Sequence, residues 1–465
     1  MRTIFPALAM AGVILTSACA TRDRDAEQVN QLLAARGTAA VPWTASSGQG
    51  QRAAPASEAL SLRRSVELAF SHSPVIREQY AELGIGAAEM LEAGKVPDLG
   101  LEYSRLSFDD GHAQVTRGVT LALADLLLLP GRVRIANAGQ QITRDRVAAK
   151  LSQLEADVEA AWFDYTSALQ AAEVQSRAAQ ASRASAEYAR RLHAAGNLPA
   201  RAQAQELAAA SSGDIAAARA TAHAQEARTR FATLVGLSTR GDWRLEPRLP
   251  PLPHHDDEPR DLVRRSLESR LDVAAARREA ALLEQAWRTT RFWRWLGDFD
   301  VGYERERDHG SVLRGPTFRL GLPLLSWNRG GVLRARSSME AARARLAAVE
   351  LDTENEVSLA LDRLDTARKI ADTYRLTLVP ERENVTARTV EEVNFMLAGA
   401  FEALAARREQ FEAYREYIEA VRDYWLARVE LRRLSGGALP ALAPDGTLNI
   451  DAPATGPSHG HGEHP

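Results

Sequence analysis

The sequence contains a single cysteine, Cys19, so no disulfide can form within the chain. It also has little net charge, −3 at pH 7 with 26% charged residues, which indicates neither a nucleic acid nor an acidic partner. Catalytic motifs are missing as well: there is no zinc-protease histidine pair, no phosphate-binding glycine loop and no nucleophile elbow. These absences predict a protein that is not an enzyme, and no cofactor is expected.

The N-terminus carries the features of an export signal, predicted over residues 1–18. Arg2 supplies the positive start, and the apolar stretch Ile4–Leu15 is too short to span a bilayer. Cys19 follows small residues in a pattern that resembles the lipobox of bacterial lipoproteins, so we expect it to be lipidated. The alternative is an ordinary signal peptide cut nearby. Residues 19–59 lack periodicity and predict an extended or partly disordered leader.

A β-hairpin is predicted where two segments of alternating polarity flank the polar turn at 307–311. One face of the hairpin should be apolar, and the other should carry the polar residues Asp298, Asp300, Glu304 and Arg319. Almost everything else in the chain predicts helix. A two-stranded ribbon is marginal in water, so this hairpin needs a sheet to join. The predicted apolar face is formed by Phe299, Val301, Tyr303, Phe318, Leu320 and Leu322.

The first half of the chain holds a second copy of this hairpin. Gly131 and Gly330, and Arg146 and Arg345, stand at one common offset, which indicates an internal duplication. The predicted organisation is a signal peptide (1–18), a leader (19–59), a first repeat (60–246), a linker (247–259), a second repeat (260–437) and a disordered His-rich tail (438–465).

Each repeat is expected to run helix, hairpin, long helix, turn and return helix. From residue 133 to about 195 the chain has no proline, and a helix of that length would reach about 90 Å. Residues 126–131 predict a short bridge into this helix. Gly196 to Pro199 then predict a helix stop and restart, and a second turn is expected at 398–400.

Three short signatures carry a family resemblance: Leu68-Ala-Phe-Ser-His-Ser-Pro74, Ser269-Arg-Leu-Asp-Val273 and Leu320-Gly-Leu-Pro-Leu-Leu. With the duplication and the export signal, the chain resembles the TolC-type outer-membrane efflux protein family. The resemblance implies a mainly α fold with a membrane β-barrel. Four strands per chain are too few to close a barrel in lipid, where open sheet edges leave backbone groups unsatisfied. The family's solution, a 12-stranded barrel completed in a homotrimer beneath a long helical barrel, is therefore expected here.

On this interpretation the apolar face of the hairpin meets lipid and the polar face meets water in the lumen. Phe292, Trp293, Trp295 and Trp327 flank the hairpin and suit an interfacial aromatic girdle. The alternative is a small soluble sheet with one face on a helix, in which these aromatics pack at the junction between sheet and helix.

The resemblance also implies that the two helical turns dock a periplasmic adaptor. Met396 is expected to pack at the second turn. The acidic gate ring of some family members does not transfer, because Glu402 is followed by Arg407 and Arg408 without paired aspartates. The expected docking residues are Gly196, Leu198, Leu397, Gly399 and Phe401.

The expected function is a passive outer-membrane channel, lipid-anchored and extending into the periplasm, that works with an adaptor and a proton-driven inner-membrane pump. The segments 394–399 and 419–428 look most like the heavy-metal branch of the family, which favours copper or related cations as cargo. The imidazoles of His459, His461 and His464 suit such metals, but a solvated tail is equally expected. The alternatives are a drug or small-molecule channel of the same type, and a periplasmic coiled-coil scaffold or adaptor.

Overall fold

The structure is a computed structural model that describes residues 22–43, 59–107, 109, 113–246, 248–253, 261–295, 299–308, 311–321 and 327–439. Cys19, Asp298, Leu322 and the three tail histidines lie outside these residues. The chain divides into two compact units. The first unit comprises Met1–Leu32, Glu78–Lys150 and Leu267–Thr353, and the second comprises Leu33–Arg77, Leu151–Ser266 and Glu354–Pro465. Each unit takes part of both predicted repeats, so the repeat boundaries remain a prediction.

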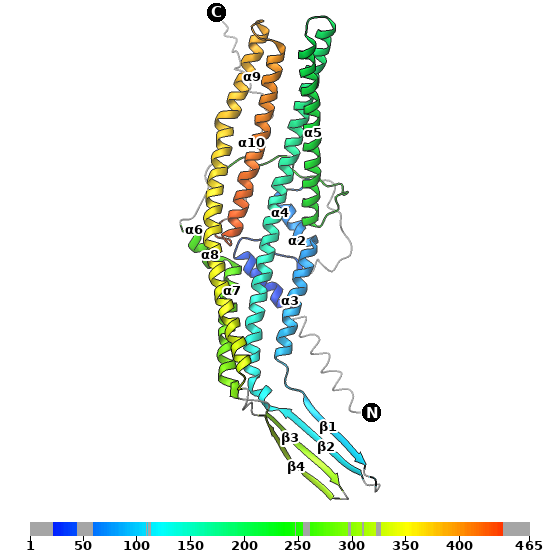
Figure 1. Ribbon diagram of the computed structural model, residues 1–465, viewed down its shortest axis with the longest axis vertical. Helices are drawn as coiled ribbons and strands as arrows, with labels where there is room; N and C mark the ends of the chain where they lie inside the picture. Colours follow the sequence, from blue (N-terminus) through cyan, green and yellow to red (C-terminus); the bar gives the residue numbers. More distant parts are fainter. Residues whose placement is uncertain are drawn as a thin grey trace, which may run out of the picture. The chain divides into compact units, whose positions relative to one another are not determined.

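The element order confirms the predicted alternation of hairpins with long helices (Figure 1). The helices are α2 (Leu62–His72), α3 (Pro74–Ala93), α4 (Leu123–Ala194), α5 (Ala200–Val235), α6 (Leu262–Ser269), α7 (Leu271–Phe292), η2 (Trp293–Trp295), α8 (Arg329–Thr373), η3 (Tyr374–Leu378), α9 (Val379–Asn394) and α10 (Ala400–Leu434).

The helix α4 is longer than its sequence suggested, with 72 residues. It begins at Leu123, so the expected bridge over residues 126–131 is wrong. Pro130 lies inside the helix, in its third turn, where its nitrogen cannot donate the usual hydrogen bond.

The helical path from α8 to α9 contains one π-turn, η3. The N–H of Val379 donates to the carbonyl of Tyr374, five residues earlier, directly before Pro380. Since proline can neither donate nor tolerate the carbonyl one turn back, the wider turn lets the helix continue past it.

Four antiparallel strands of the first unit form one sheet in the order β1-β2-β3-β4 (Figure 1). The strands are β1 (Leu99–Ser107), β2 (Ala113–Ala122), β3 (Phe299–Asp308) and β4 (Ser311–Leu320). The two predicted hairpins therefore join through β2 and β3. Val301 is opposite both Leu121 and Phe318, which places the apolar residues of both hairpins on one face.

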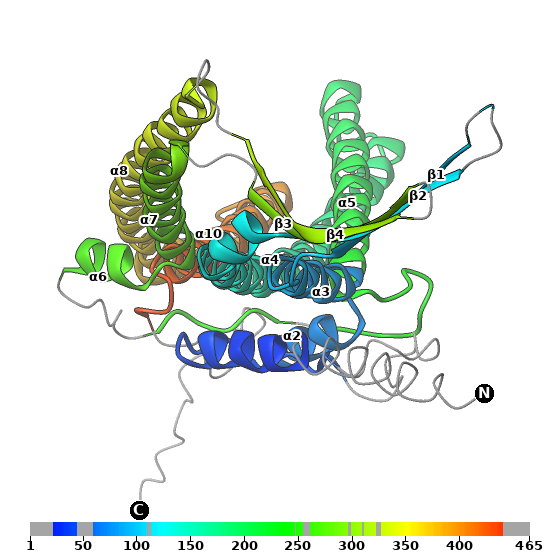
Figure 2. The ribbon, with the colours of Figure 1, turned by 90° about the horizontal axis from the view of Figure 1, so that it is seen from below.

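The opposite face of the sheet carries less side-chain bulk, because every strand contributes a glycine to it. One row across the strands runs Gly100, Thr120, Gly302 and Thr317, so glycine alternates with threonine. A Cβ at Gly302 would lie 2.8 Å from the carbonyl oxygen of Val119, so the neighbouring backbone leaves no room there. Bulk on one face and glycine on the other favours a sheet that curves toward its glycine face. Figure 2 shows β3 and β4 bending along their length.

The helices of the first unit are joined by ion pairs, of which Glu279 on α7 makes two. One carboxylate oxygen lies 2.7 Å from Arg146 Nη2 on α4, and the other lies 3.0 Å from Arg345 Nη1 on α8. These are the two arginines that stand at matching positions in the predicted repeats. Both of them bind one carboxylate.

The expected leader is partly helical, which corrects the prediction of an extended segment. Residues 22–34 form a helix whose Val29 is fully buried. Its Asp25 is also buried and pairs with Arg144 of α4. The hydroxyl of Tyr80 on α3 donates to Asp23 at 2.9 Å. The sequence did not predict this helix, because the helix is stabilised by its contacts with α3 and α4 rather than by a periodic apolar pattern of its own.

The second unit has an aromatic core that also holds the connecting segments. The rings of Phe163 on α4 and Trp425 on α10 stack with centroids 5.2 Å apart. Trp425 Nε1 donates to the Pro250 carbonyl at 3.1 Å, and the backbone N–H of Leu249 donates to Gln170 Oε1 at 3.0 Å. Part of the expected linker is therefore anchored to the helices.

The glycine row gives a matched pair of substitutions. We expect Gly302→Ala to destabilise the protein by about 1–3 kcal/mol, because its methyl group meets the Val119 carbonyl. Gly315 lies on the same face with nothing within 4 Å of the equivalent Cβ position, so Gly315→Ala should cost much less. The measurement is the midpoint of thermal unfolding of each purified variant. Equal midpoints would contradict the packing described for Gly302.

Candidate functional site

The apolar face of the sheet is exposed rather than covered. Leu101 is 82% exposed, Phe318 69% and Tyr103 65%. Large apolar side chains normally lie inside a soluble protein or against a partner. The alternative of a small soluble sheet with this face on a helix is therefore not what the described residues show. The apolar positions on this face, called the apolar rows below, are Leu99, Leu101, Val119, Leu121, Phe299, Val301, Tyr303, Pro316, Phe318 and Leu320.

The opposite face, called the polar face below, carries the sheet's carboxylates. Asp300 is opposite Arg319, with 3.9 Å between carboxylate oxygen and guanidinium nitrogen. Glu306 accepts a hydrogen bond from Gln114. Leu106 and Leu313 near the turns are the large apolar exceptions. Carboxylates therefore outnumber guanidinium groups on this face: Glu102, Asp300, Glu304 and Glu306 stand against Arg319.

Both outer strands of the sheet have a free edge. Within the described residues, β1 pairs only with β2 and β4 only with β3. Each edge presents backbone N–H and C=O groups that have no strand partner, which is a template for pairing with another chain. The strands are nine or ten residues long.

Aromatic side chains gather where the second hairpin meets its helices. Phe292 at the end of α7 is 72% exposed, and its ring lies 5.1 Å from that of Trp293. Trp327, just before α8, is 41% exposed and adopts a positive φ of 48°. These residues are not buried at a junction between sheet and helix, as the alternative interpretation required.

The turn between α4 and α5 is a tight polar reversal. Gly196 has a φ of 78°, and the N–H of Asn197 donates to the Leu192 carbonyl at 2.9 Å, which closes a Schellman-type cap. His193 Nδ1 lies 2.7 Å from the carbonyl oxygen of Leu198. Of the two residues predicted here, Gly196 is exposed and Leu198 is half-buried.

The turn between α9 and α10 uses the same cap with a different residue in its strained position. Leu397 N–H donates to the Glu392 carbonyl at 2.9 Å, and Met396 takes the left-handed conformation with a φ of 59°. Methionine is unfavourable there compared with glycine. Met396 is 93% exposed, so the expectation that it packs at the turn is wrong.

The second turn therefore presents three consecutive exposed apolar side chains. Phe395 is 77% exposed and Leu397 79%, on either side of Met396. Gly399 is exposed, whereas Phe401 is half-buried and its ring lies 5.4 Å from that of Tyr188. The sequence placed Leu397 among the expected docking residues, but not Phe395, and it predicted the wrong environment for Met396. The run Phe-Met-Leu inside a predicted turn was the available signal.

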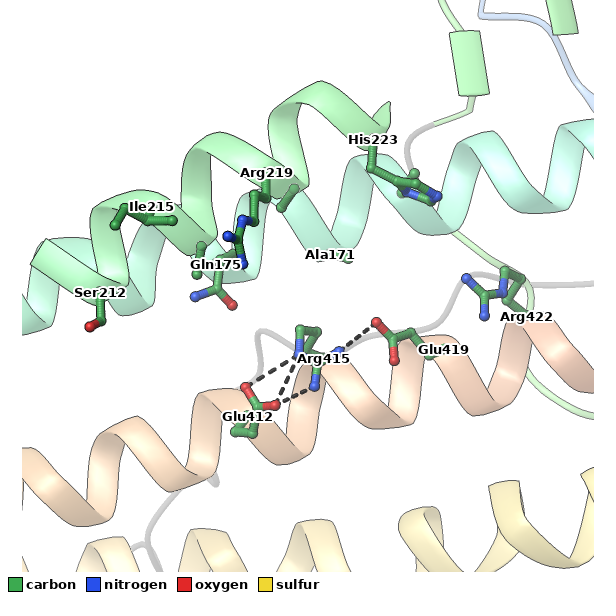
Figure 3. A pocket seen from close by; sticks show the side chains of 13 residues that line it. Ala171, Gln175, Ser212, Ile215, Arg219, His223, Glu412, Arg415, Glu419 and Arg422 are labelled. Atoms are coloured by element: carbon green, nitrogen blue, oxygen red, sulfur yellow. Dashed lines mark hydrogen bonds and ion pairs between the residues drawn. The ribbon is translucent and has the colours of Figure 1, made fainter. Parts of the chain in front are cut away.

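A groove of about 810 Å³ lies between α4, α5 and α10 in the second unit. Arg415 sits between Glu412 and Glu419, with Nη1 2.6 Å from Glu419 Oε1 (Figure 3). Arg219 and His223 of α5 face it from the other side (Figure 3). Sequence reading did not find this groove, because its charges come from segments far apart in the chain.

A buried charge cluster joins α4 to α10. Arg432 Nη2 lies 3.0 Å from Glu155 Oε1, and Nη1 lies 2.5 Å from Glu159 Oε1. Two carboxylates thus share one guanidinium, and the cluster becomes neutral when one of the two carboxylates is protonated. Burial raises the pKa of Glu159 to about 7, against the attraction of Arg432 and with repulsion from Glu155.

The described residues contain no cluster of three or more His, Cys, Asp or Glu side chains able to hold a metal ion. Nor does any helix of the described part combine the length and apolarity needed to cross a membrane.

Comparison with solved structures identifies the fold. The chain is similar to the CmeC outer membrane channel of Campylobacter jejuni, with a TM-score of 0.71 and 13% identity over 82% of this chain and 86% of that chain. For the outer membrane protein VceC of Vibrio cholerae the TM-score is 0.67, with 17% identity over 81% and 96% of the two chains. The fold is that of an outer-membrane channel. The open-state MtrE outer membrane channel of Neisseria gonorrhoeae shares this channel fold at a TM-score of 0.68, with 17% identity over 82% and 89%.

Neither the family models nor the curated proteins contain a match to the sequence. The channel fold therefore rests on the structural neighbours, which are channel and membrane proteins rather than enzymes.

The cluster around Arg432 predicts a pH dependence of stability. Glu159 has an ordinary pKa of 4.5 and a raised one in the folded protein, so between these values the folded state binds the proton more tightly. Its stabilising contribution is complete below about pH 4.5 and is lost as the pH rises through 7, by up to about 3 kcal/mol. Glu159→Gln should remove this slope, because its neutral amide does not titrate.

The measurement is the difference in unfolding midpoint between wild type and Glu159→Gln from pH 4 to pH 8. The unfolding midpoint of the variant should rise relative to that of the wild type as the pH rises. A difference that stays constant over this range would show that folding does not change the pKa of Glu159.

Proposed function

We propose that this chain is the outer-membrane channel of a tripartite efflux system, completed as a homotrimer. The observation that carries the proposal is the open four-stranded sheet with one exposed apolar face. In lipid, an open sheet edge leaves backbone groups unsatisfied, so β1 and β4 need partner strands. Three copies would supply twelve strands, and the edge of β4 in one copy would pair with β1 of the next. Strands of nine or ten residues match a tilted membrane span.

The two faces of the sheet support one orientation in the barrel. The apolar rows would meet lipid, and the polar face would line the lumen. The glycines on the polar face allow it to be the concave side, since they leave room where strands curve together. The aromatic residues Phe292, Trp293 and Trp327 would then lie at the periplasmic interface.

We further propose that the cargo is cationic, with heavy-metal ions such as copper as the first choice. The polar face supplies four carboxylates for one guanidinium per chain, and rings of such groups favour cations over anions in a pore. The heavy-metal signatures at 394–399 and 419–428 point the same way. A drug or small-molecule channel of the same type is the alternative.

The partners of the proposed channel are a periplasmic adaptor and a proton-driven inner-membrane pump. The exposed apolar run Phe395 to Leu397 is the strongest candidate contact for the adaptor, because it offers an apolar anchor on a polar helical tip. Gly196 would permit the tight reversal at the first turn, and Gly399, which has an extended backbone, precedes α10 after the second turn. Lipidation of Cys19 would hold the chain at the outer membrane. The scaffold or adaptor alternative fits poorly, since neither role calls for a sheet with an exposed apolar face.

The cargo proposal is tested by neutralising the polar face. In planar bilayers the wild-type trimer should select cations, and Glu102→Gln with Glu304→Gln and Glu306→Gln should move the reversal potential toward zero. In the host bacterium, the same variant should lose tolerance to copper, silver or zinc while drug tolerance changes little. Deleting the gene should abolish both the channel and that tolerance.

The control is Thr116→Val, a neutral change on the same face, which should leave selectivity intact. Drug tolerance lost with metal tolerance unchanged would overturn the choice of cargo. A purified protein that stays monomeric, with no heat-modifiable trimer on a gel, would overturn the channel itself.

The adaptor contact is tested at the second turn. Phe395→Ser, Met396→Gly and Leu397→Ser together should weaken binding of the purified adaptor roughly tenfold or more, because the apolar anchor is removed while glycine suits the φ of residue 396. Trimer formation should be unchanged. Binding is measured by surface plasmon resonance, with Leu198→Ser at the first turn as the matched comparison. If that single change costs more than the triple variant, the first turn is the main contact.

A further inference from the structure

Beyond the apolar rows, the charged side chains that the structure describes on the same face of the sheet are all arginines. The strand register places Arg117 opposite Tyr103 on one side and Arg305 on the other, and Arg305 is opposite Arg314. The next row toward the hairpin turns adds two more arginines, Arg105 and Arg307, on either side of Val115 and with Val312 at the edge of the sheet. Opposite positions of an antiparallel pair share a face, so these side chains form one group, called the arginine rows below.

The arginine rows are exposed, and no strand position that the structure describes on their face carries a carboxylate. All five side chains are exposed, and none makes an ion pair among the described contacts. The guanidinium carbon of Arg117 lies 5.9 Å from the centre of the Tyr103 ring, a cation–π contact. The glutamates of the strands lie on the polar face, behind the sheet. Like charges at directly opposite positions repel each other, so Arg117, Arg305 and Arg314 together call for an anion from outside the chain.

The position of the arginine rows limits where that anion can be. Rows on one face are about 7 Å apart along a strand, so the arginines begin one step beyond the apolar rows, on the side of the hairpin turns. Arginine on the lipid-facing surface of a barrel is tolerated near an interface and disfavoured at mid-depth. The opposite end of the apolar rows carries the aromatic residues Phe292, Trp293 and Trp327. The two ends of the band thus differ in chemistry.

We propose that the arginine rows bind the phosphate groups of phosphorylated glycolipid in the outer leaflet of the membrane. All five residues are arginine, whose planar guanidinium binds phosphate oxygens in pairs. Adjacent rows of guanidinium groups suit a headgroup with more than one phosphate. This inference rests on the proposed function, since it needs the apolar rows to lie in a membrane with the hairpin turns outward.

The experiment uses the full-length protein purified in detergent and a fluorescent lipid A that carries two phosphates. Wild type should bind it, and Arg117→Gln with Arg305→Gln and Arg314→Gln should weaken binding roughly tenfold or more. The corresponding triple lysine variant keeps the charge and should recover much of the affinity. Arg319→Gln, on the polar face, is the matched control and should bind like wild type.

Two further measurements keep the inference testable if the glutamine variant folds poorly. For wild type, binding should weaken as the salt concentration rises, and lipid A stripped of its phosphates should bind much less tightly. Equal binding of both lipids, or full affinity in a correctly folded glutamine variant, would overturn the inference.

Insertion into neutral phosphatidylcholine vesicles separates this result from the proposed function. A wild-type trimer that inserts there without preferring phosphorylated lipid contradicts only the role of the arginine rows. A protein that does not insert at all contradicts the channel, and this inference with it.

Discussion

The free edges of the sheet are the constraint on which the rest of the structure depends. Backbone N–H and C=O groups must find partners wherever water is excluded, and β1 and β4 each leave a full edge without a strand partner. The exposed apolar face adds a second demand, because it gains stability only where water is absent. Both demands are met together if identical chains close the sheet inside lipid. In water the edges of a single chain can be hydrated, but its apolar face stays uncovered.

The sheet is built from two similar hairpins, but the two halves of the chain are not equivalent. Arg146 and Arg345 stand at matching positions, and both bind the carboxylate of Glu279 on α7. At the position in α3 that matches Glu279, the chain has Tyr80, which bonds to Asp23 of the N-terminal helix instead. The turns diverge as well, since the second carries Met396 where the first has Gly196. The two halves thus have the same order of hairpin and helices and differ at the surfaces that would meet partners.

Much of the fold could be predicted from the sequence, because its elements depend on local patterns. Alternation identified the hairpin residues from Phe299 to Leu320, and proline and glycine marked the helical turns. The features that the sequence did not predict depend on contacts between residues that are distant in the chain. The helix at residues 22–34 is stabilised by its contacts with α3 and α4. Arg432 can be shared by two glutamates only because α4 packs on α10. The exposure of Met396 was missed because methionine usually packs, whereas here a backbone cap holds it outward.

The pairing of β2 with β3 has a consequence for how the chain can change. Side chains alternate between faces with a period of two, so a single inserted residue in either strand would turn every following side chain over. Along the rest of that strand the apolar side chains would then lie on the polar face, and polar side chains such as Glu304 and Glu306 of β3 would lie on the apolar face. Insertions of two residues keep the faces intact. We therefore expect natural variants of these strands to differ in length by even numbers, with odd changes confined to the hairpin turns or absorbed by a bulge.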